Sequence, residues 1–151
     1  FEHLDWATAA GVREERVVIV GLRDVDATER QAIRDSPMTA FTMSDIDERG
    51  LQDVLDEAFD VAASGVEGIH VSLDLDMLDP HEAPGVGTPV RGGVTYREAH
   101  AAFEALSRYD ERHGILRSMD LVEVNPILDE RNETAEMAAE LAASGLGKRI
   151  L

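Results

Sequence analysis

The apolar positions along the chain fall into short continuous runs that alternate with longer periodic stretches. The continuous runs, rich in β-branched residues, predict strands covered on both faces at residues 16–21, 39–43, 68–76 and 117–124. Apolar residues three and four positions apart predict amphipathic helices at 27–34, 46–63, 95–113 and from 132 or 134 to 145 or 147. Strands that alternate with helices of this length are typical of right-handed crossovers. The pattern therefore predicts an α/β fold with a parallel sheet.

Capping residues and glycines mark several boundaries of these elements. Ser44, with Asp47 three residues later, predicts the start of the second helix, and Gly65 its end. Thr95 predicts the start of the third helix. Residues 79–93 are rich in Pro and Gly, and this connection is too long and irregular to be a simple turn. Long structured loops of this kind are usually functional or mobile.

The composition excludes several classes of protein. The 151 residues carry 14 basic and 31 acidic side chains, for a net charge of −17, and no cysteine. A disulfide-stapled module is therefore excluded, and the charge is wrong for nucleic-acid phosphates. No apolar run reaches the roughly 20 residues of a membrane span, so we expect neither a nucleic-acid nor a membrane partner. The dispersed acidity favours a halophilic source, with an ordinary acidic cytosolic domain from a GC-rich genome as the alternative.

Two aspartates at the end of the third predicted strand are the first candidates for chemistry. On an extended strand, Asp74 and Asp76 direct both carboxylates to one side, where they repel each other and lose solvation. A hard divalent cation such as Mg²⁺ or Mn²⁺ would compensate them. Alternatively, the aspartates cap backbone amides in a turn. Asp79, followed by Pro80, fits that turn role better.

The segments around these aspartates resemble a known family. Residues 72–80 (S-L-D-L-D-M-L-D-P) and 83–90 (A-P-G-V-G-T-P-V) are similar to the S-x-D-x-D-x-x-D-P and A-P-G-x-G-T-P signatures of the ureohydrolases, the arginase and agmatinase family. The resemblance extends in one register to residues 21–26, 95–98, 123–129 and 146–151. The R-D-V-D segment and the asparagine of E-V-N-P favour arginase over agmatinase.

The resemblance implies an arginase-like fold, a three-layer parallel sheet with helices on both faces. Family members are about twice as long, so residues 1–151 would be the carboxyl-terminal part of a single ureohydrolase domain. The amino-terminal G-G-D-H and D-A-H-x-D motifs of the family are missing, and the start at Phe1–Trp6 suggests a segment cut from something longer. We expect the isolated chain to expose a strand edge and apolar faces, and to aggregate or to need its other half or high salt to fold.

The resemblance also implies a reaction. Arginases hydrolyse L-arginine to L-ornithine and urea with a hydroxide bridging two Mn²⁺ ions. Asp74 would bridge both ions and Asp76 would bind one, whereas Asp26, Thr88 and Glu123 would contact the substrate. No catalytic residue is assigned, because the proton-transferring histidine belongs to the missing half. The family context is arginine metabolism and the urea cycle, in the cytoplasm, with trimers or hexamers as the complete assembly.

Taken by themselves, the same residues also have simpler interpretations. Glu123 could be a helix cap or a surface acid, Asp26 could start a helix, and Thr88 could stiffen the loop. His70 is interpreted as a satisfied core histidine, and no histidine is assigned to metal. Arg97 and Glu98 resemble subunit-contact residues of some relatives, but an exposed helical ion pair is the preferred interpretation.

Two alternative functions stay open. One is an agmatinase-like ureohydrolase that acts on a decarboxylated substrate. The other is a non-catalytic acidic module or remnant that binds divalent ions. Because Asp74 and Asp76 are too few ligands for two ions, we expect no catalysis from this chain alone.

Overall fold

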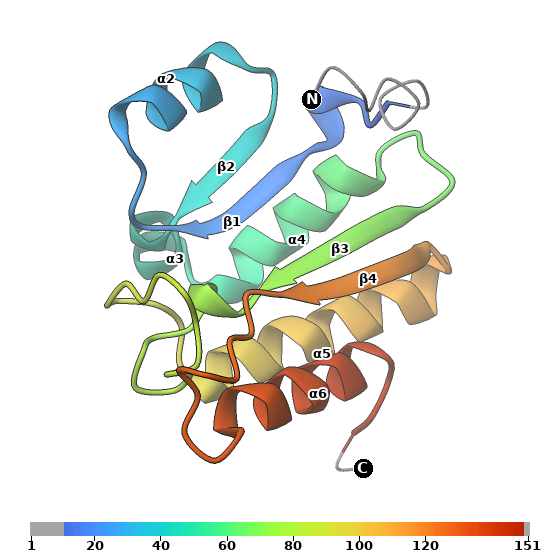
Figure 1. Cartoon of the computed structure of the whole chain (residues 1–151). Coiled ribbons are helices and arrows are strands. Elements are labelled where there is room, and N and C mark those ends of the chain that lie inside the picture. Colours follow the sequence, from blue (N-terminus) through green and yellow to red (C-terminus); the bar gives the residue numbers. More distant parts are fainter. Residues whose placement is uncertain (1–10, 150–151) are drawn as a thin grey trace.

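Two pairs of parallel strands form the centre of the computed structural model, which describes residues 11–149 (Figure 1). β1 (Val18–Leu22) pairs with β2 (Thr39–Thr42), and β3 (Ile69–Asp74) pairs with β4 (Leu116–Val122). The predicted α/β class and parallel strand direction are therefore confirmed. Within residues 11–149 the two pairs are separate sheets, because no ladder joins β1 to β3.

Helices and short 3-10 turns connect the strands in the predicted order. Their bounds are η1 (Glu14–Arg16), α2 (Ala27–Asp35), α3 (Met43–Arg49), α4 (Leu51–Ala63), η2 (Leu75–Met77), α5 (Tyr96–His113) and α6 (Glu133–Gly145). As predicted, Thr95 caps α5: its hydroxyl accepts the amide of Glu98, and the Glu98 carboxylate accepts the amide of Thr95. This reciprocal box supplies partners for two backbone donors at the helix start.

The single helix predicted for residues 46–63 is wrong, because the segment forms two helices. Gly50 separates α3 from α4 with a φ of +87°, a conformation that side-chain-bearing residues rarely adopt. The predicted cap at Ser44 is also wrong. Thr42 is the N-cap, and it exchanges hydrogen bonds with Asp45. The same box chemistry therefore starts the helix two residues earlier.

The last helix begins without help from its own N-cap side chain. Asn132 has a left-handed backbone (φ 65°) and caps no amide. Instead the carboxylate of Asp129 accepts the amides of Thr134 and Ala135, at 3.1 and 3.2 Å. Acceptors at this end satisfy helix donors that have no partner within the helix.

The larger apolar core lies between the β3–β4 pair and the helices α5 and α6. Leu73 of β3, Phe103 of α5 and Leu141 of α6 are all buried in it. A smaller cluster joins Phe41 of β2 to Val54 of α4. Close packing of this kind fixes the position of the strand ends, where the candidate site lies.

Within residues 11–149, no helix is long and apolar enough to cross a membrane. The segment Phe1–Trp6 and the last two residues of the matching segment 146–151 lie outside the described residues.

Candidate functional site

The carboxyl end of β3 does not stay extended as far as predicted. The strand ends at Asp74, and Asp76 lies in the 3-10 turn η2. The cause is local: Oδ1 of Asp74 accepts the amide of Asp76 at 2.9 Å and bends the chain. Asp74 thus makes the backbone cap that was the alternative interpretation, and its other oxygen remains available to a ligand.

The negative charge of Asp76 is only partly balanced by its surroundings. Burial raises the pKa of Asp76, and the negative charge of Asp74 raises it further, against the smaller lowering effects of Arg23 and Thr88. A cation beside the two carboxylates would relieve this cost. The pair therefore fits a hard divalent ion.

The described residues do not complete such a site. No group of three or more His, Cys, Asp or Glu side chains within residues 11–149 is arranged to hold a metal ion. Mg²⁺ and Mn²⁺ prefer several oxygen ligands in near-octahedral arrangements. Asp74 and Asp76 can supply only part of that shell.

Two of the residues predicted to bind substrate lie beside the acidic turn. The hydroxyl of Thr88 donates to Oδ2 of Asp76 at 3.4 Å. The carboxylate of Glu123, at the end of β4, lies against the same loop, because a Cβ placed on Gly87 would be 3.3 Å from Oε2 of Glu123. The structure therefore brings four residues together at the carboxyl end of the β3–β4 pair: Asp74, Asp76, Thr88 and Glu123.

Glu123 holds this position with a strained backbone. Its φ of 65° is in the left-handed region, which costs a side-chain-bearing residue roughly 1–2 kcal/mol. Two residues later, the amide of Asn125 donates to the carbonyl of Gly85 at 2.8 Å and ties this segment to the loop. Strain of this kind persists where surrounding contacts determine the conformation, and it is common at functional sites.

Asp26 has a different environment from the other predicted site residues. Its Oδ1 accepts the amides of Thr28 and Glu29, at 2.7 and 2.9 Å. The carboxylate of Glu29 accepts the amide of Asp26 in turn. The helix-start interpretation is therefore what the structure shows. Among the described residues, none of the other predicted site residues is a hydrogen-bond partner of Asp26, so its role toward substrate stays a prediction.

Arg23 is a site residue that the sequence analysis did not single out. Its Nε and Nη2 donate to the carbonyl of Val90 at 3.1 and 2.9 Å, and Nη2 also donates to the carbonyl of Asp76. This one side chain connects the end of β1 to the acidic turn and to the far end of the loop. The available indication was an arginine placed directly after a short apolar strand, at the start of the R-D-V-D segment.

The long loop closes on itself through Asp79. Its carboxylate accepts the amide of His81 at 3.0 Å and that of Gly92 at 2.8 Å, and these two bonds lower the pKa of Asp79. The backbones of Met77 and Asp79 bond in turn to that of Val94. The predicted turn role of Asp79 is confirmed, and the loop is ordered by its own hydrogen bonds.

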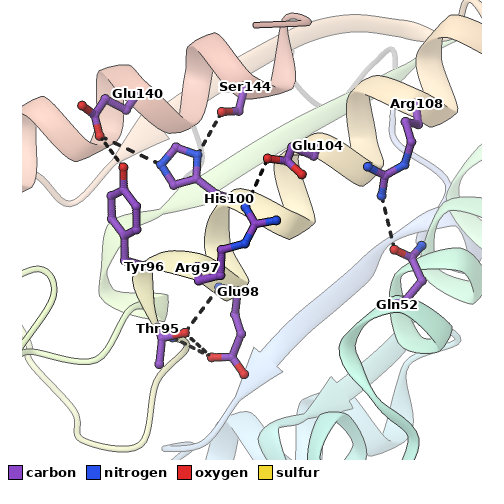
Figure 2. A network of polar contacts seen from close by, with 10 residues as sticks. All are labelled: Gln52, Thr95, Tyr96, Arg97, Glu98, His100, Glu104, Arg108, Glu140 and Ser144. Atoms are coloured by element: carbon purple, nitrogen blue, oxygen red, sulfur yellow. Dashed lines mark hydrogen bonds and ion pairs between the residues drawn. The ribbon is translucent and has the colours of Figure 1, made fainter. Parts of the chain in front are cut away.

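The remaining polar candidates lie away from this edge. The prediction that His70 is a core histidine is wrong. Its side chain is half exposed, and its ring contacts Ser118 at 2.8 Å and Asp120 at 3.3 Å across the β3–β4 pair. The cause is that this face of the pair is uncovered in the described chain. Arg97 lies 3.2 Å from Glu104, so the two form an ion pair along α5 in which Arg97 is the more exposed partner. Figure 2 shows this pair and the separate contact of Glu98 with Thr95.

Comparisons with known proteins identify the family of the chain. A family model described as the arginase family matches residues 3–147. The arginase of Bacillus subtilis (strain 168) is 50% identical over 143 residues, which cover 95% of this chain and 47% of the relative. The solved structure of the arginase from Bacillus caldovelox is 44% identical with a TM-score of 0.86, over 93% of this chain and 46% of that one.

A solved structure with another name is also similar. A hypothetical agmatinase from Burkholderia thailandensis is 28% identical with a TM-score of 0.72, over 93% of this chain and 41% of that one. The chain thus spans about half the length of the curated relatives it matches. The acidic strand end, the closed loop and the family match over nearly all of the sequence lead to one conclusion: the chain belongs to the arginase family.

Proposed function

We propose that this chain is the carboxyl-terminal part of an arginase that hydrolyses L-arginine to L-ornithine and urea. The single observation that carries the proposal is the gathering of Asp74, Asp76, Thr88 and Glu123 at one edge of the β3–β4 pair. The 50% identity to the Bacillus subtilis arginase supports arginine over other amidines, since the agmatinase similarity is only 28%.

Each residue has a distinct task in this proposal. Asp74 and Asp76 hold the metal ions, for which we propose Mn²⁺. Glu123 binds the guanidinium, a planar fork that a carboxylate complements with two parallel hydrogen bonds. Thr88 contacts the substrate from the loop, and Asp26 binds its α-amino group. When bound, a pair of Mn²⁺ ions supplies a hydroxide near neutral pH for attack on the guanidinium carbon.

The electrostatics of the edge support the assignment of Glu123. The substrate guanidinium is a cation, and the carboxylate of Glu123 lies exposed at a strained position beside Gly87. A preformed anion held by the backbone needs little reorganisation when a cation binds.

The complete protein needs more than this chain supplies. We propose that the other half provides the remaining metal ligands and the group that transfers the proton. We further propose that the complete enzyme works in the cytoplasm as a trimer or hexamer, in arginine metabolism and the urea cycle.

The test measures urea release after this chain is co-expressed with the part of the Bacillus subtilis arginase that the match does not cover. The assembly should release urea from arginine, and Glu123→Gln should lower kcat/KM by at least about 100-fold, because a charge-assisted fork is lost. Glu104→Gln is the matched control: it removes a partly buried acid on α5 that pairs with Arg97, away from the site, and should leave the rate unchanged. A folded assembly that releases no urea, or one insensitive to Glu123→Gln, would refute the proposal. Preference for agmatine over arginine would favour the agmatinase alternative.

A further inference from the structure

A wide groove lies between α4 and α5, away from the candidate site. Its cavity has a volume of about 730 Å³, within the range of about 300–1,000 Å³ that small-molecule sites occupy. α5 starts beside the loop of the candidate site, whereas the residues of α5 that line the groove, 108–113, form its other end. The groove is therefore separate from the acidic end of β3.

The two walls of the groove carry opposite charges. Asp56 and Asp60 of α4 lie one helical turn apart, and so do Arg108 and Arg112 of α5. Residues four positions apart share a face of a helix, so each wall presents a pair of like charges. All four residues are exposed, and a ligand can reach them from solvent.

No ion pair joins the two walls within residues 11–149. Figure 2 shows that Arg108 donates instead to the side-chain oxygen of Gln52, at 3.4 Å. Nε of Arg112 donates to the carbonyl of Arg108 at 3.2 Å. Neither arginine pairs with a carboxylate there, although the chain has 31 acidic and only 14 basic side chains. Both guanidinium groups thus retain donors for a ligand.

The buried Tyr109 holds the walls apart and forms the floor between them. Its ring packs on Phe59 of α4 and on His113, with centroid distances of 5.1 and 4.3 Å, and Arg112 lies over it at 5.8 Å. The hydroxyl donates to Asp60 at 3.4 Å. Burial raises the pKa of Tyr109 and the charge of Asp60 raises it further, so the phenol stays a neutral donor at neutral pH. The groove therefore has an uncharged aromatic floor between two charged walls.

We propose that the α4–α5 groove binds a small amino acid whose carboxylate and ammonium group lie at opposite ends of the molecule. The carboxylate would accept hydrogen bonds from Arg108 and Arg112, whose planar forks complement a carboxylate. The ammonium group would lie against Asp56 and Asp60. The aliphatic chain between the two ends would cover the ring of Tyr109.

A ligand with a single charge is a poorer occupant. A simple anion would face Asp56 and Asp60 and the field of a chain with a net charge of −17, and a simple cation would face two guanidinium groups. Glu111 and Arg149 also line the cavity, but they pair with each other at 2.8 Å and add little net charge. The inference does not depend on the proposed reaction, because the cavity is lined by none of the residues assigned to that reaction.

Nuclear magnetic resonance on the full chain, in the salt that keeps it folded, tests the proposal with 5-aminopentanoate as the probe. The backbone amides of residues 108–113 and the Nε–H groups of Arg108 and Arg112 should shift saturably. Pentanoate lacks the ammonium group and pentylamine lacks the carboxylate. Each should bind at least about tenfold more weakly than the probe, because one end loses its charge-assisted hydrogen bonds.

A pair of variants separates the arginine wall from general charge. Arg108→Gln combined with Arg112→Gln should weaken binding of 5-aminopentanoate by at least about tenfold. Arg97→Gln removes an exposed arginine of the same helix outside the cavity and should leave binding unchanged. Four outcomes would overturn the proposal: no saturable shift, shifts confined to residues outside the groove, equally tight binding of pentanoate or pentylamine, or unchanged binding by the double variant. The comparison of the three probes needs no variant, so it decides even if the double variant does not fold.

Discussion

Thr134 anchors the loop of the candidate site to helix α6 through one buried hydroxyl. The residue is fully buried, and its Oγ1 accepts the amide of Gly85 at 2.8 Å. The carbonyl of Gly85 accepts the amide of Asn125 at 2.8 Å, two residues after Glu123. Gly85 has no room for a side chain, because a Cβ there would lie 2.5 Å from two atoms of Asp129. The loop, the β4 end and α6 are thus fixed together at this point.

Removing the hydroxyl should therefore destabilise the chain markedly. Thr134→Val keeps the volume of the side chain but leaves the buried Gly85 amide without an acceptor. An unsatisfied buried donor costs about 1–3 kcal/mol. Thr134→Ser keeps the acceptor and loses one buried methyl group, which costs about 0.8 kcal/mol. The lost hydrogen bond, rather than lost packing, should decide which of the two variants is less stable.

Urea unfolding in high salt, which the isolated acidic chain is expected to need for folding, measures both changes by far-ultraviolet circular dichroism. The midpoint should fall in the order wild type, Thr134→Ser, Thr134→Val, with an unchanged m-value, which shows that the native and denatured states keep their compactness. If Thr134→Val is no less stable than Thr134→Ser, the hydroxyl does not hold the loop and the reasoning is refuted.

The Asp129 carboxylate, the Arg23 guanidinium and the net charge each give one further prediction. Burial raises the pKa of Asp129, but bonds from the Thr134 and Ala135 amides lower it overall, so its stabilising effect is present above its ordinary pKa of 3.8 and is lost as the pH falls below that. In Asp129→Asn, the free energy of unfolding should therefore fall less steeply as the pH is lowered below about 4, measured by urea unfolding at several pH values. Arg23→Met should speed proteolysis within residues 79–93 by about tenfold, since its bond to Val90 is lost, whereas Arg97→Met should not. Raising NaCl from about 0.1 to about 2 M should raise Tm by screening the charge of −17; a salt-independent Tm would contradict the halophilic interpretation.

Local chemistry explains how much of the fold could be predicted from the sequence. The order of strands and helices follows from apolar periodicity, and the Thr95 box follows from residue types three positions apart. The break at Gly50 was missed because the apolar stripe continues on both sides of it, and only the backbone angle distinguishes a hinge from a tolerated helical glycine. Thr42 was missed as the N-cap because Ser44 also sits three residues before an aspartate, and residue type alone does not distinguish the two positions.

The candidate site was also only partly predictable from the sequence. The site residues were predicted because they lie in motifs of the family resemblance: Asp26, Asp74, Asp76, Thr88 and Glu123. The structure places the last four together at the carboxyl end of the β3–β4 pair, whereas Asp26 caps α2. Arg23 could not be predicted, because its partners are backbone carbonyls 53 and 67 residues away that have no signature in the sequence. Pairing between distant segments depends on the packing of the whole domain, which periodicity does not describe.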